Sequence, residues 1–590
     1  MTIRLGKHPV AIAAYTTLKR ITDYGRLPAL ILTLSIAAGA LVMPSLSEAQ
    51  SFQHPGALNN QADLDRMKTK VAASAQPWKG SWDILVSNTN GWTSHNPEAV
   101  ATITAGGGLP ENYIRLARDA ARAYQLALRY HGDGSTWAAD KSVEIMNTWA
   151  SIHTGWAGDS NVSLRSGIYG YQFASAAELM RDYSGWVPAD FTAFKDYMLN
   201  QFYLGGSRNK DFLDRHHDTR GTHYWANWEH ASLASAMAIG VLLDDQAIFD
   251  HALDYFYDGI GNGNMNRAVT YVHPNGLGQW QESGRDQGHS TMGPVLLGAI
   301  CEIAWNQGYD LYGALNNRLL SGVEYISKYN TKRDVPFAPY VHDAGRLDSS
   351  LVRTVYWDIS SVGRNQLRPG WDLVYNHYVN RMGMAAPYTG EYAAKTRPEG
   401  GGFNFGGNSG GFDSLGFTTL THSRDSIASD VAPSGLRATQ EYDRRITLSW
   451  WGSARATSYN VKRSTTSGGP YTTIATVGTK DIFHVDTDLT AGRTYHYVVS
   501  ANTPSGETAN SDQVSAIAVA PGGISYQAEN AAYGGDAELI TSTTNHNGTG
   551  SIVPHSGYIE FTGVDGGDGG PTTLAMRYAH GGPNRTGVWT

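Results

Sequence analysis

Residues 231–243 read Ala-Ser-Leu-Ala-Ser-Ala-Met-Ala-Ile-Gly-Val-Leu-Leu, a run of small and apolar side chains. Other blocks with apolar residues at helical spacing lie on both sides of this run, separated by Gly, Asn and Asp turns. They span residues 112–130, 168–183, 191–202, 246–257 and 291–306. Many helices of ordinary length joined by short loops predict an all-α (α/α) toroid over residues 50–425, with helix pairs around a cleft. No heptad repeat persists, which excludes a coiled coil.

The pattern changes near residues 424–431, after which short stretches alternate between apolar and polar side chains. Residues 446–450, 458–463 and 494–501 are the clearest of these predicted strands. Their spacing predicts an all-β, immunoglobulin-like sandwich over residues 432–518. Trp450, Tyr459, Leu489 and Tyr495 match the pattern of a fibronectin type III domain. Leu489, six residues before Tyr495, resembles the tyrosine corner of that family.

The last part of the chain, residues 524–590, resembles the opening of a β-sandwich (jelly-roll) carbohydrate-binding module. The resemblance rests on Ile524-Ser-Tyr-Gln-Ala-Glu-Asn530 and on residues 557–561. It implies a structural calcium ion held by Glu529 together with Gln527, because oxygen ligands suit this hard cation. The sequence stops at Thr590, so we expect the N-terminal part of such a module.

The composition bounds the class of protein. The chain has 590 residues, too many for one ordinary core, and 17% of them are charged. It is rich in Gly (67), Tyr (33) and Trp (16), which favours a folded, carbohydrate-handling protein. A net charge of −8 argues against nucleic acid as a partner. An anionic polysaccharide stays open, because a few basic residues in a cleft can outweigh a mildly acidic exterior.

The N-terminus combines scattered basic residues, an apolar run over residues 27–43, and Ser47-Glu48-Ala49. This order predicts a secretory signal peptide over residues 1–49, hence a secreted or periplasmic protein. A membrane anchor is the alternative, because the run is near the lower length limit for spanning. No later segment is apolar enough to span a bilayer, so we expect no membrane association after signal removal. The single cysteine, Cys301, allows no intramolecular disulfide and is expected to be a buried thiol.

Two short stretches hold side chains that suit acid–base chemistry. His223-Tyr224-Trp225-Ala226-Asn227-Trp228 is the first, and Gln281-Glu-Ser-Gly-Arg-Asp-Gln-Gly-His289 is the second. An Arg and an Asn can hold a uronic-acid carboxylate, whereas a His and a Tyr can move protons on the neighbouring carbons. These stretches therefore point to cleavage of a polyuronate by elimination.

The first part of the chain resembles the alginate lyase superfamily, the helical-toroid enzymes that cleave uronate polysaccharides by β-elimination. The resemblance is carried by residues 52–56 (Phe-Gln-His-Pro-Gly), 63–68 (Asp-Leu-Asp-Arg-Met-Lys), 77–78 (Pro-Trp), 223–228, 282–289 and 375–378 (Tyr-Asn-His-Tyr). It implies a polysaccharide lyase that acts on alginate or on a related polyuronate such as glucuronan, with no cofactor for catalysis.

Elimination removes the proton at C5, which becomes acidic only when the adjacent carboxylate is neutralised. Both the resemblance and this chemistry assign the neutralising role to Asn227 and Arg285. An Arg fork binds a carboxylate in two places, and an amide donates a hydrogen bond without adding a base. The structural alternatives are a helix N-cap for Asn227, and a salt bridge from Arg285 to Glu282 or Asp286.

The reaction also needs a base and an acid, and three residues are candidates: His289, His223 and Tyr224. His289 lies four residues after Arg285, so the two would share a face if this segment is helical. His can act as the base, and Tyr can serve either role. The sequence does not divide the two roles among the three residues.

Further residues are predicted to contact the substrate through stacking rings or polar groups. For any single Trp, packing in the core is the alternative. The predicted contacts are Trp225, Trp228, Gln287, Glu282, Tyr271, His273, Tyr375, His377, Tyr378 and Arg397.

Other functions fit parts of the same pattern. His216, His217 and Asp218 with His223, joined by His230, could bind a metal ion, although no His-Glu-x-x-His spacing occurs. A toroid glycoside hydrolase could pair Glu282 or Asp286 with Glu399. A polysaccharide-binding or adhesion protein without catalysis is a third possibility.

The Gly-rich segment 397–411 lacks the preceding strand and the following Lys-Ser/Thr of a P-loop. We expect a loop whose backbone approaches the substrate or another domain.

Overall fold

The computed structural model describes residues 51–520, apart from residues 207, 407–408 and 442–443, and the strand residues 3–5, 532–534, 538–540, 551–553, 558–561, 574–578 and 585–589. The chain divides into two units, residues 52–521 and residues 1–51 with 522–590. Apart from residues 3–5, the predicted signal peptide lies outside the described residues. So do the predicted calcium ligands Gln527 and Glu529.

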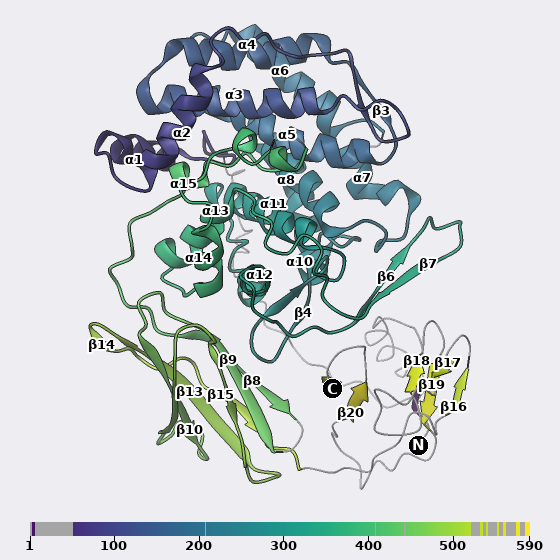
Figure 1. The fold of residues 1–590 in the computed structure, drawn as a ribbon, viewed down its shortest axis with the longest axis vertical. Coiled ribbons are helices and arrows are strands. Elements are labelled where there is room, and N and C mark those ends of the chain that lie inside the picture. Colours follow the sequence, from purple (N-terminus) through teal and green to yellow (C-terminus); the bar gives the residue numbers. More distant parts are fainter. Residues whose placement is uncertain are drawn as a thin grey trace, which may run out of the picture. The chain divides into compact units, whose positions relative to one another are not determined.

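The first part of the larger unit is helical (Figure 1). Its α-helices are α1 (Gln61–Ala72), α2 (Trp78–Asn90), α3 (Ile114–Asp133), α4 (Thr136–Ile152), α5 (Asn161–Met180), α6 (Pro188–Met198), α7 (Asn209–Arg215), α8 (Ala226–Leu243), α9 (Gln246–Asp258), α10 (Met265–Ala268), α11 (Gln287–Asn306), α12 (Ala314–Asn330), α13 (Trp371–Asn376), α14 (Pro387–Ala393) and α15 (Thr418–Thr421). Short 3-10 or π-helical turns are η1 (Leu199–Tyr203), η2 (His216–Asp218), η3 (His377–Arg381), η4 (Gly402–Asn404) and η5 (Ser409–Phe412). All the helical blocks predicted from the sequence are helices here.

Three two-stranded ribbons interrupt the helices. They pair β2 (Thr102–Ala105) with β3 (Gly155–Gly158), β4 (Val269–Val272) with β5 (Gly278–Trp280), and β6 (Tyr340–Ala344) with β7 (Val352–Tyr356). The first pair is parallel and the other two are antiparallel. The β6–β7 hairpin, which the sequence did not predict, contributes side chains to the site described below.

The helices form a closed ring. Contacts run from α3 to α5, α8, α11 and α13, and return through α15 and α2 to α3. Helices α5, α8 and α11 are buried along most of their length, whereas α4 and α9 pack outside them against α3 and α8. A helix that is apolar on all sides requires neighbours on all sides, which explains why the run 231–243 occupies the inner layer. The architecture is the predicted (α/α) toroid.

The contact between α5 and α8 is close enough to require a glycine. A Cβ added to Gly167 would lie 2.7 Å from the backbone carbonyl carbon of Ala231. Larger side chains at this position would push the two inner helices apart. Because α8 carries Asn227 in its first turn, this packing also positions the site.

The second part of the larger unit is a β-sandwich. Its strands are β8 (Ser434–Glu441), β9 (Arg445–Trp451), β10 (Ser458–Ser464), β11 (Thr472–Val477), β12 (Phe483–Asp486), β13 (Thr494–Thr503), β14 (Gly506–Glu507) and β15 (Val514–Ile517). One sheet has the order β12-β9-β8, and the other β11-β10-β13-β14 with β15 also paired to β13. Trp450 packs on Tyr459 between them, with ring centroids 5.6 Å apart.

The predicted tyrosine corner is present in this sandwich. The backbone N–H of Thr490 donates a hydrogen bond to the Tyr495 hydroxyl at 3.0 Å, and Leu489 is buried beside it. The arrangement is that of an immunoglobulin-like sandwich with the fibronectin type III features predicted from the sequence.

In the smaller unit, the described strands are β1 (Ile3–Leu5), β16 (Ala532–Gly534), β17 (Glu538–Ile540), β18 (Ser551–Val553), β19 (Tyr558–Phe561), β20 (Leu574–Tyr578) and β21 (Arg585–Trp589). They pair antiparallel as β1-β19-β16, β17-β18 and β20-β21. The strands β16 to β21 lie within residues 524–590, the segment predicted to be the N-terminal part of a carbohydrate-binding module.

Two expectations about single elements can be compared with the structure. Cys301 is fully buried in α11, as expected for a structural thiol. Among the described residues, no helix is both long enough and apolar enough to cross a bilayer.

A charged cluster ties the N-terminal segment to the inner helices. His54 places Nδ1 2.9 Å from Glu178 Oε2 and Nε2 2.7 Å from Asp244 Oδ1, and Arg181 pairs with both carboxylates. Burial lowers the pKa of His54, but the hydrogen bonds and charges of Glu178 and Asp244 outweigh burial and raise the pKa overall. Because the pKa is higher in the folded state, protonation of His54 stabilises the fold. This stabilisation is fully present below the unfolded pKa of about 6.5 and is lost as the pH rises through the folded pKa.

We therefore predict a pH-dependent effect of His54→Gln on stability. At about pH 5.5 the substitution should lower the free energy of unfolding by roughly 1–3 kcal/mol, because a charged hydrogen-bonding group is removed. At about pH 8.5, on the alkaline side of the unfolded value, the difference should shrink, because the wild-type imidazole loses its proton as the pH rises through the folded pKa. Urea unfolding followed by tryptophan fluorescence measures both values. An equal difference at the two pH values would show that His54 contributes only through packing.

Candidate functional site

The two stretches singled out in the sequence meet through Asn227 and Glu282. Asn227 lies in the first turn of α8, and Glu282 lies in the loop between β5 and α11. The backbone N–H of Asn227 donates to Glu282 Oε1 and its Nδ2 donates to Oε2, both at 3.0 Å. Both side chains are buried. This two-point contact fixes the orientation of the Asn227 amide, whose buried Oδ1 has no hydrogen-bond partner among the described residues.

This geometry excludes an N-cap role for Asn227 and a substrate contact for Glu282. The N-cap of α8 is Trp225, so Asn227 is not the cap. Glu282 is fully buried, which leaves it no surface for substrate contact, and it acts instead by positioning Asn227. Burial raises the pKa of Glu282, against the opposing charges of His289 and Arg285.

Arg285 is held loosely. Its Nη1 lies 3.9 Å from Glu282 Oε2, and its Nε lies 3.4 Å from Asp286 Oδ2. Its guanidinium lies over the Trp225 ring, 4.8 Å from the centroid. Among the described residues, Nη1 is buried and has no hydrogen-bond partner. These are weak ion pairs, which leave a buried donor free to bind an incoming carboxylate.

His289 is oriented by the acid that caps its helix. Asp286 is the N-cap of α11 and accepts a hydrogen bond from the backbone N–H of His289 at 2.8 Å. The same carboxylate lies 2.7 Å from His289 Nδ1. The other ring nitrogen, Nε2, lies 3.3 Å from Arg285 Nη2. A carboxylate at Nδ1 keeps the proton there, so that the lone pair lies on Nε2 and accepts a hydrogen bond from Arg285 Nη2. The ring can act as a base once the Arg285 donor turns to a substrate carboxylate.

The hydrogen bonds of Asp286 also explain its charge state. Burial alone would raise the pKa of this carboxyl, but the hydrogen bonds from His289 and the charge of Arg285 hold the pKa below its usual range. Asp286 is therefore ionised near neutral pH. An ionised Asp286 also stabilises the imidazolium that forms when His289 takes up a proton.

His223 and Tyr224 are both proton donors in their resting states. His223 Nδ1 accepts a hydrogen bond from the backbone N–H of Gly345 at 2.9 Å, which places the ring proton on Nε2. Burial and the nearby His216 lower the pKa of His223, so the ring is neutral. Burial raises the pKa of Tyr224, which is in edge contact with His223 at 4.5 Å between centroids. Of the three proton-transfer candidates, His289 has the geometry of a base.

The β6–β7 hairpin brings His342, which the sequence did not single out, against Trp225. The two rings stack with centroids 4.1 Å apart and planes within 3°. Tyr356, on the other strand of the hairpin, meets the Trp225 ring edge-on at 5.7 Å. Burial lowers the pKa of His342 to about 4. The Trp225 ring is thus engaged by protein groups, and it supports Arg285 rather than offering a free sugar platform.

A pocket of about 190 Å³ is lined by Asn227 and His289, whereas Arg285, His223 and Tyr224 are not among its lining residues. It brings Asn227 and His289 together with three polar residues that sequence reasoning missed, Arg165, Arg368 and Asp413. The remaining lining residues are Leu164, Met292 and Gly410. Gly410 belongs to the Gly-rich segment, so the backbone of that segment does reach the pocket. No local clustering marks Arg165 in the sequence, because its neighbours along α5 face the core.

Two other predicted contacts, Gln287 and Trp228, do not line the pocket. Gln287 is buried, where its amide donates to the backbone carbonyls of Ser283 and Ser360. Trp228 packs on Tyr224 with centroids 4.9 Å apart. These positions give Gln287 and Trp228 structural contacts.

On β4 and the loop that follows it, Tyr271 is exposed and His273 is buried. The His273 ring stacks with Tyr325 at 6.0 Å. Tyr271 thus keeps a surface that a polymer can touch, whereas His273 does not.

The group around α13 belongs to the core. His377 stacks on Tyr312 with centroids 3.6 Å apart, and burial lowers the pKa of His377 to about 3. The Tyr378 hydroxyl donates to the Tyr312 carbonyl at 2.8 Å. Because both rings are buried, His377 and Tyr378 have no surface for a polymer, and we do not retain them as substrate contacts.

Arg397 and Tyr375 pair with each other in the same region. The Arg397 guanidinium lies 4.7 Å from the centroid of the half-buried Tyr375 ring and forms an ion pair with Asp372. The structure does not bring either residue to the pocket lined by Asn227 and His289.

The histidines proposed as metal ligands have separate partners. His216 Nε2 pairs with Glu229 Oε1 at 2.8 Å, His217 Nε2 with Ser163 Oγ at 2.8 Å, and His230 Nε2 with the Gly263 carbonyl at 3.1 Å. Within the described residues, the groups close enough to share an ion are Asp63–Glu302–His422 and His95–Glu98–Asp119. Neither group includes a residue of the pocket.

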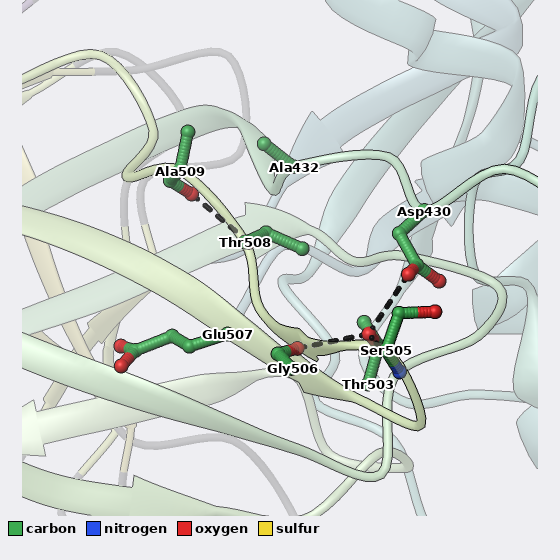
Figure 2. A pocket seen from close by; sticks show the side chains of 8 residues that line it. All are labelled: Asp430, Ala432, Thr503, Ser505, Gly506, Glu507, Thr508 and Ala509. Atoms are coloured by element: carbon green, nitrogen blue, oxygen red, sulfur yellow. Dashed lines mark hydrogen bonds between the residues drawn. The ribbon is translucent and has the colours of Figure 1, made fainter.

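A second pocket, of about 220 Å³, lies in the β-sandwich (Figure 2). Its lining consists of Asp430, Ala432, Thr503, Ser505, Gly506, Glu507, Thr508 and Ala509. The titratable groups among these are the two carboxylates, Asp430 and Glu507, which would repel an anionic polymer. The pocket between α5, α8 and α11 is therefore the candidate active site.

Parts of this chain are similar to known proteins. Residues 71–336 match the family model described as alginate lyase. No curated protein matches the chain. Solved structures that resemble it include alginate lyase A1-III from Sphingomonas species A1, with 15% identity over 64% of this chain and 98% of that chain and a TM-score of 0.41.

Two further solved structures each resemble part of the chain. An alginate lyase from Bacteroides ovatus has 14% identity over 47% of this chain and 84% of that chain, with a TM-score of 0.38. An Fn3-like protein from Clostridium thermocellum has 39% identity over 17% of this chain and 100% of that chain, with a TM-score of 0.15.

Proposed function

We propose that this polysaccharide lyase, whose residues 71–336 form an alginate lyase family domain, cleaves a uronic-acid polysaccharide such as alginate or glucuronan at the pocket lined by Asn227 and His289. The observation that carries the proposal is the orientation of His289. Its Nδ1 is held by Asp286, its Nε2 contacts Arg285 Nη2, and the residue lines the pocket. A base and a carboxylate-binding cation therefore lie within one hydrogen bond of each other.

The first step is binding of the uronate carboxylate. Arg285 brings a buried, unpaired N–H, and Asn227 brings the amide N–H that Glu282 does not use. Neutralising the carboxylate lets negative charge develop on it as the C5 proton leaves. Because Trp225 and Glu282 already fix these donors, little reorganisation is needed in the transition state.

His289 then takes the C5 proton on Nε2, and the C4–O bond breaks as the C4–C5 double bond forms. The ionised Asp286 stabilises the resulting imidazolium. The leaving oxygen needs a proton, and we assign its delivery to the pair His223 and Tyr224. The lowered pKa of His223 keeps its imidazole neutral, and the raised pKa of Tyr224 keeps its hydroxyl protonated.

The carboxylates required for hydrolysis have other partners. Glu282 binds Asn227, and Asp286 binds His289. Glu399 is buried, where it accepts a hydrogen bond from the backbone N–H of Gly370 at 2.9 Å and others from Thr418. Burial, together with Asp372, raises the pKa of Glu399 to about 7. An acid–base pair flanking a glycosidic bond is not formed by these residues, which favours elimination over hydrolysis.

Two parts of the proposal rest on sequence alone. A secreted or periplasmic location follows from the predicted signal peptide. The β-sandwich serves as a spacer, and the C-terminal module holds polymer. Calcium bound by Glu529 and Gln527 would belong to that module and not to the reaction.

The reaction class can be tested by incubating the purified chain with a panel of polyuronates while following ultraviolet absorbance and new reducing ends. Elimination leaves a conjugated double bond, so both signals should rise together. A neutral-sugar polymer should not be cut, because no carboxylate acidifies its C5 proton. Reducing ends without absorbance would identify a hydrolase, and polymer retention without new ends would identify a binding protein.

Chelation should leave the rate of the elimination nearly intact, since protein donors neutralise the carboxylate.

A further inference from the structure

We propose that Arg165 and Arg368, set by Asp413, form a second carboxylate site that binds the uronate next to the one being deprotonated. The enzyme would then require carboxylates on adjacent sugars of its substrate. This inference rests on the proposed function and names the class of polymer within it.

Arg368 is fixed in place by three acceptors. Its Nη1 donates to Asp413 Oδ2 at 2.8 Å and to the Gly410 carbonyl at 3.0 Å, and its Nε donates to the Gly288 carbonyl at 3.1 Å. Gly288 directly precedes His289 in the first turn of α11. The position of Arg368 is thus coupled to the helix that carries the proposed base.

Arg165 approaches the same pocket from α5 with fewer partners. Its Nη2 donates to the Tyr113 hydroxyl at 3.1 Å, and its guanidinium lies over the Tyr113 ring, 4.0 Å from the centroid. Its Nη1 lies 4.0 Å from Asp413 Oδ1, which is the outer limit of an ion pair. Among the described residues, Nε is buried and makes no hydrogen bond. Arg165 is therefore a rigidly stacked cation whose donors are not saturated.

The balance of charge in the pocket favours an anion. Arg165 and Arg368 carry two positive charges, and Asp413 offsets one of them. The remaining positive charge lies in a pocket that Asn227 and His289 also line, so a ligand carboxylate bound there adjoins the reacting sugar. The volume of about 190 Å³ is small compared with pockets that enclose whole drug-sized molecules. It therefore admits only a short part of the polymer, in which the reacting sugar and its neighbour lie side by side.

Selectivity for uronates follows because Arg165 has donors without acceptors in the protein. A uronate carboxylate can bind the Arg165 fork in two places, a strong and directional contact. A neutral sugar in the same position would leave the partly desolvated guanidinium without a counter-charge, which disfavours that polymer. The pocket therefore selects for consecutive uronates and against polymers in which uronates alternate with uncharged sugars.

The test uses the full chain and a polyuronate in which a random fraction of the carboxylates has been reduced to alcohols. If cleavage needs two adjacent carboxylates, the initial rate at subsaturating substrate should fall with the square of the fraction that remains, to about one quarter when half remain. Arg165→Gln should lower kcat/KM on the unmodified polymer by about 10–100-fold. Its rate should then fall in proportion to the remaining carboxylates, because only the reacting carboxylate still matters.

Two controls separate binding from folding. Arg445→Gln removes an arginine from β9 of the sandwich and should leave both the rate and its dependence on carboxylate content unchanged. Arg165→Lys keeps the charge without the fork, and should show an intermediate loss while the steep dependence on carboxylate content remains. Thermal unfolding confirms that each variant is folded.

The outcomes distinguish this inference from the proposed function. No unsaturated product from the wild type on any uronate polymer would overturn the proposed function itself. Unsaturated product with a wild-type rate that falls only in proportion to the carboxylate fraction would overturn the second site alone. So would an Arg165→Gln variant within about twofold of the wild type on the unmodified polymer.

Discussion

Arg285→Ala is expected to lower kcat/KM on a polyuronate by about two to four orders of magnitude. The substitution removes a buried donor from a carboxylate on which charge grows in the transition state. The loss should therefore appear mainly in kcat, with a smaller change in KM. Initial rates from ultraviolet absorbance over a range of substrate concentrations measure both parameters. Asn227→Ala should act in the same direction, because it removes the second donor.

Arg285→Lys is the matched variant, since it keeps a positive charge over Trp225 but cannot bind a carboxylate in two places. We expect it to recover part of the activity lost in Arg285→Ala. Arg285 makes only long ion pairs to Glu282 and Asp286, so neither variant should unfold the toroid. A rise in KM at constant kcat for Arg285→Ala would show that this residue only binds substrate. Another group would then have to stabilise the negative charge that develops in the transition state.

The inner helices could be predicted because their composition directly reflects their position. The run 231–243 has apolar side chains in every direction, and only a helix surrounded by other helices tolerates that pattern. The start of the same helix could not be predicted. The sequence placed it near Ala231, whereas α8 begins at Ala226. The first turn is held by Glu282 from another part of the chain, and local preferences carry no information about such a contact.

The site was predicted only as far as local clustering reaches. Asn227, Arg285 and His289 lie in stretches dense in polar and aromatic residues, and the structure brings these stretches together. Arg165 and Arg368 lie far from both stretches in the sequence and reach the pocket only through the closure of the ring. A single polar residue on a buried helix has no sequence pattern that distinguishes it from a structural ion pair.

The stretch 375–378 shows the opposite error. Its Tyr and His residues have the composition of a sugar-binding cleft, yet Tyr312 and Arg381 engage the His377 ring inside the core. Aromatic rings with polar edges serve both roles equally well, because each can stack and hydrogen-bond in either place. Composition therefore could not separate the active site from this buried cluster.

His289→Ala is expected to lower kcat by about two to four orders of magnitude, because the base that removes the C5 proton is lost. Asp286→Asn should also lower kcat severely, although it leaves the imidazole in place. An asparagine still caps α11, so the helix start is kept. Its amide, however, can donate to Nδ1 and so move the ring proton to Nε2, where the lone pair is needed. Both effects should be measured as kcat and KM on the same polyuronate, with His484→Gln in β12 of the sandwich as a control.

If His289→Ala left kcat unchanged and raised only KM, the base would have to be sought elsewhere. Tyr224 would then be the next candidate. Because burial raises its pKa, substrate binding would have to lower that pKa before the hydroxyl could act as a base. If instead His289→Ala and Asp286→Asn both reduce kcat while substrate affinity is kept, the pair acts as the oriented base that its geometry indicates.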